Sequence, residues 1–469
     1  MYNADNQNHN KEAVASPSSD ESPTKIFKLT IDCLDEIFEY LSLKDLHSFG
    51  QTCKRMNKVA GEYFKQNYSS APNLCKVDGI YTNYDKDDVT NEQIHISGFN
   101  KFMPCISYCG HCPQHDFGAF KYTKSHINEF EATNHIYLGW LSINCKTVEH
   151  FKQLLPQLGI VQYQCCSVDG DIYDLILKYC KNLREIYVQG SDGGKRINGK
   201  FNWLLQEYPK LERLEWRPND PCKIEELRDF FIRNPNVKRF STTSKFWWTN
   251  GDIFSNSKAK LDIFEIKGFY VNTGHDKDGD KILKSHVNLL NRLYEQGFYK
   301  RLYIYVDSVY EEKITAFASI KGLELLFIRW FQKSYNLAQL TNLRELMIMY
   351  GSKDPKDMEV LANGLTKLER LNIGGSKIDD IMPFIRRSPK LNKIKFIPRN
   401  KDVVLNLAMM NEERAKLVGA RKIIIYTRDD VFLATKWTTR NGDINLSFIE
   451  MRRLDSIEWN HHIHPYSIL

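Results

Sequence analysis

The residue types best suited to metal chemistry gather in one short segment, CISYCGHCPQH. It holds Cys105, Cys109, His111, Cys112 and His115. Thiolates and imidazoles bind Zn²⁺ tetrahedrally, and a structural zinc site normally takes ligand pairs from two elements separated by a dozen or more residues. No second cysteine pair follows at that spacing. We therefore expect a loop of buried thiols and surface histidines, with no bound metal.

A second polar segment, VNTGHDKDGD, contains the aspartates and glycines that are common in calcium-binding loops. It lacks the Asp-x-Asp-x-Asp-Gly order and the closing glutamate of such a loop, so we expect a solvated insertion. The chain also lacks the HExxH, GxSxG and glycine-rich phosphate-loop motifs. The sequence therefore predicts no catalytic residues and no cofactor.

Charge and hydropathy exclude two classes of partner. The chain has 469 residues, of which 42% are hydrophobic, and its 65 Lys and Arg against 58 Asp and Glu give a net charge of +7 with both signs mixed. Nucleic-acid-binding domains concentrate basic residues on one face, so we expect no nucleic-acid partner. No window approaches the roughly 18 apolar residues of a membrane span, so we expect no membrane partner.

The cysteines and the N-terminus indicate the compartment. Eleven cysteines are scattered without small-domain spacing, and the N-terminus holds no apolar segment of signal-peptide length. Both features favour reduced thiols, and we expect the protein in the cytoplasm, the nucleus or both. The first 24 residues end in a Ser/Pro/Asp/Glu tract, which is typical of a disordered tail.

Apolar residues at helical spacing begin after this tail. One stripe of a first amphipathic helix is formed by Leu34, Ile37, Phe38 and Leu41, and Asp32 is its expected N-cap. Two further short helices are predicted from about Lys44 and Thr52, with apolar residues three apart at Leu46 and Phe49, then at Cys53, Met56 and Val59. Three helices in some forty residues bury little surface, so we expect this module to need a partner.

The order and spacing of these residues resemble the F-box family. A leucine opening at Leu29, a Leu-x-x-Ile-Phe-x-x-Leu helix, an Asp-Leu pair and a Cys-Lys-Arg-Met segment follow one another. Thr30 stands where the family usually has proline and Met56 where tryptophan is commonest, but neither change removes the apolar stripe. The adaptor-binding residues that the resemblance implies are Leu29, Leu34, Ile37, Phe38, Leu41, Leu46, Cys53 and Met56.

The F-box resemblance implies docking to a Skp-type adaptor, which connects to a cullin scaffold, a RING subunit and a ubiquitin-charged E2. An alternative interpretation makes the three helices a cap that seals the first repeat of the body. Truncating Leu34, Ile37 or Phe38 to alanine distinguishes the two interpretations. If the helices are a cap, the variant should fail to fold; if they are a docking module, the variant should fold but lose affinity for the adaptor.

Most of the remaining chain repeats a short alternating string of the Leu-x-x-Leu-x-Leu type. Clear copies are LREIYV at 183–188, LERLEW at 211–216, LELLFI at 323–328 and LERLNI at 368–373, and the starts of successive strings lie 20 to 38 residues apart, most of them near 25. This period resembles the leucine-rich repeat family, which implies an α/β fold: a curved solenoid with parallel strands on the concave face and helices on the convex face. The predicted organisation is a disordered tail at 1–24, the F-box at 25–68, an irregular connecting segment at 69–128, the solenoid at 129–450 and a C-terminal tail at 451–469.

The leucines of each string should point into the stack, which leaves the intervening residues on the concave sheet. In the early repeats these are Glu185, Tyr187, Arg213, Glu215, Arg217 and Arg239. The predicted substrate-binding residues of the central repeats are Arg301, Tyr303, Tyr305, Phe327, Arg329, Met347, Met349 and Arg370. Aromatic and arginine side chains on adjacent strands are typical of an interface core. Two alternatives remain open. The register of the strings could be shifted by one residue, which would turn these side chains into the core of the stack, or the C-terminal tail could fold across them.

Together the two resemblances imply a substrate-recognition subunit of a Skp-cullin-F-box ubiquitin ligase. It would recruit a protein substrate on the concave face for ubiquitination and proteasomal degradation. Such a subunit is not an enzyme, because no cysteine has to receive ubiquitin as a thioester. The alternative is a non-degradative leucine-rich repeat scaffold or regulator that binds the adaptor without delivering a substrate.

Overall fold

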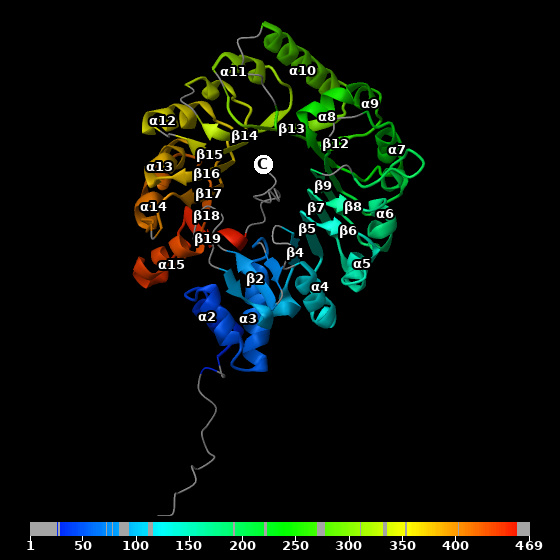
Figure 1. Cartoon of the computed structure of the whole chain (residues 1–469). Helices are drawn as coiled ribbons and strands as arrows, with labels where there is room; N and C mark the ends of the chain where they lie inside the picture. The colour runs from blue at the N-terminus through cyan, green and yellow to red at the C-terminus, as the bar shows by residue number, and fades with distance from the viewer. Residues whose placement is uncertain are drawn as a thin grey trace, which may run out of the picture.

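Three N-terminal helices are followed by one large, mostly parallel sheet with helices on its outer side. Figure 1 shows the strands along the inside of a curve that almost closes into a ring, so that the two ends of the sheet approach each other beside the N-terminal helices. None of the helices that can be described is long and apolar enough to span a membrane. The computed structural model describes residues 26, 29–71, 73–76, 78–83, 93–110, 116–190, 193–219, 223–269, 277–309, 311–331, 335–351, 354–401 and 403–456.

The N-terminal helices are α1 (Ile31–Phe38), α2 (Leu43–Gly50) and α3 (Lys54–Asn67). The Thr30 side chain accepts a hydrogen bond from the Cys33 amide at 3.4 Å, which makes Thr30 the N-cap of α1. The expectation that Asp32 caps this helix is therefore wrong, because the helix begins one residue before it. The hydroxyl of Ser42 caps α2 in the same way, by accepting from the Asp45 amide at 3.2 Å.

The segment after these helices is more regular than the sequence indicated. It supplies the strands β1 (Asn73–Lys76), β2 (Gly79–Asn83), β3 (Gln93–His95) and β4 (Cys105–Cys109). β1 pairs with β2 in antiparallel fashion and with β4 in parallel fashion. The sheet thus starts well before residue 129, the predicted start of the solenoid.

From β4 onward each strand pairs in parallel with the next strand of the main sheet. The repeated strings of the sequence fall on these strands. A small second sheet joins β6 (Ser142–Ile143) to β8 (Ser167–Val168). The main strands are β5 (His135–Gly139), β7 (Ile160–Gln164), β9 (Glu185–Gln189), β10 (Arg213–Arg217), β11 (Arg239–Thr243), β12 (Leu261–Lys267), β13 (Tyr299–Val306), β14 (Leu323–Phe331), β15 (Glu345–Gly351), β16 (Arg370–Ser376), β17 (Lys393–Pro398), β18 (Ile423–Thr427) and β19 (Ile449–Arg453).

The connections between strands run over the outer side, and most contain a helix (Figure 1). The α-helices are α4 (Asp116–Ser125), α5 (Cys145–Val148), α6 (Ile172–Leu175), α7 (Glu226–Arg233), α8 (Ser244–Thr249), α9 (Gly251–Ser255), α10 (Lys277–Glu295), α11 (Glu311–Ala318), α12 (Pro355–Gly364), α13 (Ile378–Arg387), α14 (Leu407–Ala415) and α15 (Asp429–Thr438). The 3₁₀ helices are η2 (Ser97–Phe102), η3 (Ile127–Glu129), η4 (Lys152–Gln157), η5 (Leu177–Tyr179), η6 (Asn202–Leu205), η7 (Tyr335–Gln339), η8 (Arg440–Gly442) and η9 (Leu454–Ser456).

One continuous apolar core runs between the sheet and its outer helices and extends into the N-terminal helices. Alternate residues of each strand enter it, for example Leu302 and Ile304 of β13. The residue between them, Tyr303, lies on the opposite, inner face, because side chains alternate along a strand. The fold therefore leaves one whole face of the sheet free of the main core.

Candidate functional site

The inner face of the sheet carries the substrate-binding residues that the sequence predicted, in the predicted alternation. Tyr303, Tyr305, Phe327 and Met347 form a cluster of their own with Leu325, apart from the main core. The alternative of a register shifted by one residue is therefore excluded for these four. Met349 packs against the cluster and is half-buried.

The members of this inner cluster are brought together by register. β13 pairs with β14 so that Tyr305 lies opposite Phe327, which in turn lies opposite Met347 on β15. The rings of Tyr305 and Phe327 have centroids 5.4 Å apart. All three side chains are almost completely buried, so their direction was predicted correctly but their degree of burial was not.

Three arginines predicted for the same site flank the cluster and are half-buried. Arg370 Nε lies 3.0 Å from Glu345 Oε2, and Arg329 Nη1 lies 3.7 Å from Asp307 Oδ1. Arg301 lies next to the cluster on β13, in register with Ile263. Whether these arginines bind a substrate stays a prediction.

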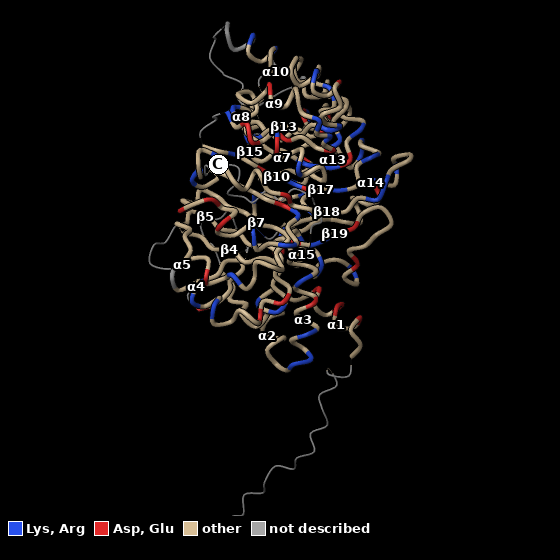
Figure 2. The backbone as a smooth tube through the Cα atoms, turned by 90° about the vertical axis from the view of Figure 1, so that its right-hand side faces the viewer, with Lys and Arg blue, Asp and Glu red and all other residues tan. Residues whose placement is uncertain are grey.

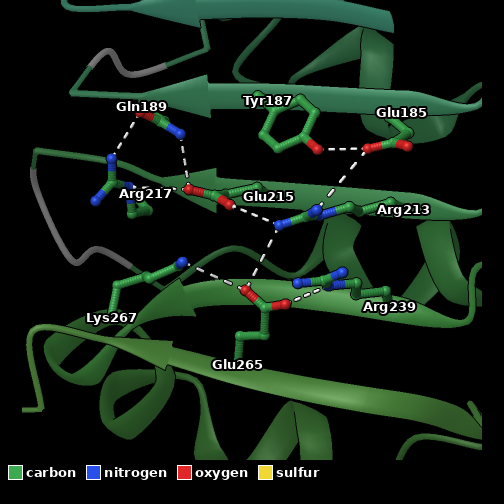
Figure 3. A network of polar contacts seen from close by, with 9 residues as sticks. All are labelled: Glu185, Tyr187, Gln189, Arg213, Glu215, Arg217, Arg239, Glu265 and Lys267. Atoms are coloured by element: carbon green, nitrogen blue, oxygen red, sulfur yellow. Dashed lines mark hydrogen bonds and ion pairs between the residues drawn. The ribbon is translucent and has the colours of Figure 1, made fainter. Parts of the chain in front are cut away.

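The neighbouring strands β9 to β12 carry a network of charged side chains on the inner face (Figure 3). At its centre Arg213 Nη2 lies 3.4 Å from Glu215 Oε2 and 3.5 Å from Glu265 Oε2. Glu265 also pairs with Arg239, and its Oε2 lies 3.4 Å from Lys267 Nζ. One carboxylate thus pairs with three cationic side chains from three adjacent strands, which ties their register together.

The network continues to the carboxyl ends of β9 and β10. Gln189 Nε2 donates to Glu215 Oε1 at 2.7 Å, and Arg217 Nη2 donates to Gln189 Oε1 at 2.6 Å. Arg217 and Glu215 are predicted for this face, whereas Gln189, Glu265 and Lys267 are not. The string LDIFEIK contained the signal, because its alternate positions place Glu265 and Lys267 on the same face as the other members.

At Lys267 of this network, burial outweighs the neighbouring charges. It lowers the pKa of Lys267 to about 8, against the opposing effect of the Glu265 and Glu215 carboxylates. The Lys267 ammonium also lies 3.5 Å from the centroid of the Tyr305 ring, and burial raises the pKa of that phenol well above its usual value. This contact joins the charged network to the apolar cluster, so the two form one continuous inner surface.

The structure describes only part of the metal-like segment CISYCGHCPQH. Cys105 and Cys109 lie in β4, whereas His111, Cys112 and His115 lie outside the described residues. Within the described ranges no group of three or more His, Cys, Asp or Glu side chains is placed to hold a metal ion. The first part of the calcium-like segment and the C-terminal tail from residue 457 also lie outside the described residues, so neither prediction about them is addressed.

In the N-terminal helices, the residues predicted to bind an adaptor divide into two groups. Leu34, Phe38, Leu46 and Met56 are completely buried, and their side chains hold the helices together. The half-buried group, which packs at the edge of the core, is Leu29, Ile37, Leu41 and Cys53. The second group offers surface to a partner, and the adaptor contact of either group stays a prediction.

Comparison with known protein families identifies this module. Residues 26–63 match the F-box domain. An F-box implies binding to a Skp-type adaptor in Skp-cullin-F-box complexes. The match covers α1, α2 and all but the last four residues of α3, and does not extend to the curved sheet; no curated protein matches the chain.

The F-box contacts both the first and the last part of the curved sheet. On one side Asn57 Nδ2 donates to the Gly98 carbonyl at 3.0 Å, next to the first strands. On the other side Arg453, at the end of β19, donates through Nη2 to the carbonyl oxygens of Glu39 at 3.0 Å and Leu41 at 2.9 Å. The F-box therefore closes the gap between the first and last strands.

Two further polar contacts strengthen the second junction. The buried Lys436 ammonium of α15 pairs with Glu39. The Ser70 hydroxyl donates to the Asp455 carbonyl at 3.0 Å. Figures 1 and 2 both place α15 beside the F-box helices. No local sequence pattern indicates these contacts, because they join residues about 400 positions apart.

Proposed function

We propose that this chain is the substrate-recognition subunit of a Skp-cullin-F-box ubiquitin ligase. The F-box docks to the Skp-type adaptor, and the curved sheet is a leucine-rich repeat solenoid whose inner face recruits a protein for ubiquitination and degradation. The match of residues 26–63 to the F-box carries this proposal. The scattered cysteines favour the cytosol or nucleus as its compartment.

The inner face supports the second half of the proposal. The three arginines beside its apolar cluster, Arg301, Arg329 and Arg370, are only half-buried and so remain partly open to a partner, and arginine is among the commonest energetic anchors of protein interfaces. In this arrangement the subunit needs no catalytic group, because it acts by holding a substrate lysine near the charged E2.

The test uses two surface variants of the full chain. Ile37→Asp changes a half-buried F-box residue and should abolish adaptor binding, whereas Arg329→Glu changes a half-buried residue of the inner face and should abolish partner binding. Partners are found by affinity capture and mass spectrometry. Each is then added to a reconstituted ligase with E1, E2, cullin, RING subunit and adaptor.

The expected result is ubiquitin conjugation of the captured partner with the wild type and with neither variant. A wild-type chain that binds both adaptor and partner but yields no conjugates would support the non-degradative scaffold instead. A wild-type chain without affinity for the adaptor would refute the proposal. Circular dichroism of both variants serves as the control for folding.

A further inference from the structure

An exposed tryptophan lies beside the F-box although it comes from the other end of the chain. Trp437 lies near the end of α15, and 67% of its surface is exposed, the largest fraction for any tryptophan in the described ranges. Its indole packs edge-on against the Tyr40 ring, with centroids 5.0 Å apart. Because Tyr40 lies within the matched residues 26–63, the exposed indole continues the surface of the docking module.

The position of Trp437 is fixed before any partner binds. The preceding residue, Lys436, is buried, pairs with Glu39, and holds its ammonium 4.6 Å from the centroid of the Tyr40 ring. The Tyr40 hydroxyl rests against Gly442, where a Cβ atom would lie 1.8 Å from it. Because these groups are already ordered, binding through Trp437 would lose little conformational entropy.

The F-box alone offers limited area to a partner. A stable interface uses about 20–30 residues on each side, and part of the matched span, at Asn57 and at Glu39 and Leu41, already contacts the body of the chain. Residues of that span whose side chains are unavailable because they are buried include Leu34, Phe38, Leu43, Leu46, Met56, Ala60 and Tyr63. The surface next to α1 is the natural extension, and α15 supplies it.

We propose that the Skp-type adaptor docks on a composite surface formed by the F-box and by α15, with Trp437 as an anchor. This inference rests on the proposed adaptor docking and adds to it a residue from the C-terminal end of the chain. Tryptophan is among the commonest interface anchors because its large ring fills an apolar pocket. The composite surface is continuous, since the Trp437 and Tyr40 rings are in contact.

The test is the affinity of the full chain for a recombinant Skp-type adaptor, measured by calorimetry. Trp437→Ala should weaken binding about 30-fold, which corresponds to about 2 kcal/mol, and Trp437→Phe should recover most of the loss. The matched control is Trp330→Ala on β14. Trp330 is 51% exposed and also packs on one tyrosine, with its ring centroid 5.0 Å from that of Tyr350. Its loss should leave adaptor affinity unchanged.

Hydrogen exchange provides a readout that needs no substitution. Adding the adaptor should slow amide exchange in α15 as well as in the F-box helices. Equal affinity of wild type and Trp437→Ala, with α15 exchange unaffected, would overturn the composite surface while leaving F-box docking intact. Self-association of the chain that depends on Trp437, without a change in adaptor affinity, would assign this surface to a second copy and also overturn it. A wild type without any adaptor affinity would refute the proposed function itself.

Discussion

Replacing Arg453 with alanine removes the side chain that joins the last strand to the first helix. Arg453 is buried, donates to the carbonyl oxygens of Glu39 and Leu41, and pairs through Nη1 with Asp429. Breaking a buried ion pair by removing one partner costs about 3–5 kcal/mol, and each hydrogen bond to a charged group contributes about 1.5–3 kcal/mol. Because these contributions share one side chain they do not add, and we expect the free energy of unfolding to fall by about 4 kcal/mol.

Urea unfolding followed by fluorescence measures this loss, and the neighbouring arginine is the control. The Arg452 side chain is 48% exposed and pairs with Glu450, so Arg452→Ala should change the free energy of unfolding by less than about 0.5 kcal/mol. Arg453→Lys should lie between the two, because an ammonium lacks the planar fork that reaches several acceptors. A loss below about 1 kcal/mol for Arg453→Ala would refute the reasoning, since the F-box and last strand would then be held together by other contacts.

Three further predictions concern the sheet. Gly351→Ala should lower the thermal midpoint far more than Gly297→Ala, because both have positive φ but only Gly351 would place a Cβ atom 2.0 Å from a backbone oxygen; equal shifts would contradict this. Burial lowers the pKa of Lys267 to about 8, so the folded state releases its proton first as pH rises. Between pH 7 and 9.5 the free energy of unfolding of the wild type, measured by chemical unfolding, should therefore rise by on the order of 2 kcal/mol relative to that of Lys267→Met. A difference between the two proteins that does not change with pH would show that the pKa of Lys267 is not lowered. Glu265→Gln should cost about 3 kcal/mol or more in the same assay because Glu265 is completely buried, whereas Glu295→Gln in an exposed pair should cost less than about 1 kcal/mol.

The parts of the fold that could be predicted are those encoded within a few residues. The spacing of Leu34, Ile37 and Phe38 fits the helix α1, which buries Leu34 and Phe38. The alternation of strings such as YKRLYI placed Tyr303 on the face opposite to Leu302. The start of α1 was harder to predict, since Thr30 and Asp32 lie two residues apart and both residue types are good N-caps. In the structure Thr30 is the N-cap.

Burial on the inner face could not be predicted from alternation. A strand pattern gives the side to which a residue points, but its exposure depends on what the neighbouring strands place beside it. Tyr305 packs against Phe327, which lies opposite it, and the Lys267 ammonium lies over its ring. The strands before residue 129 were missed for a related reason, since β1 to β4 have three to five residues each and no repeated string.

Closure of the ring bears on how the proposed ligase subunit would present a substrate. An F-box joined to the body at one end only could swing relative to the inner face, and a substrate lysine would then reach the E2 from many directions. Here Asn57 ties the F-box to η2 beside the first strands, while Arg453 ties it to β19 and Lys436 ties it to α15. Two attachments on opposite sides remove that rotation, which favours a fixed geometry of transfer.

Arg453→Ala should therefore broaden the set of lysines ubiquitinated on a captured partner even under conditions in which the chain stays folded. Mass spectrometry of the conjugates measures this, and an unchanged set of sites would mean that the substrate itself, and not the F-box junction, fixes the geometry.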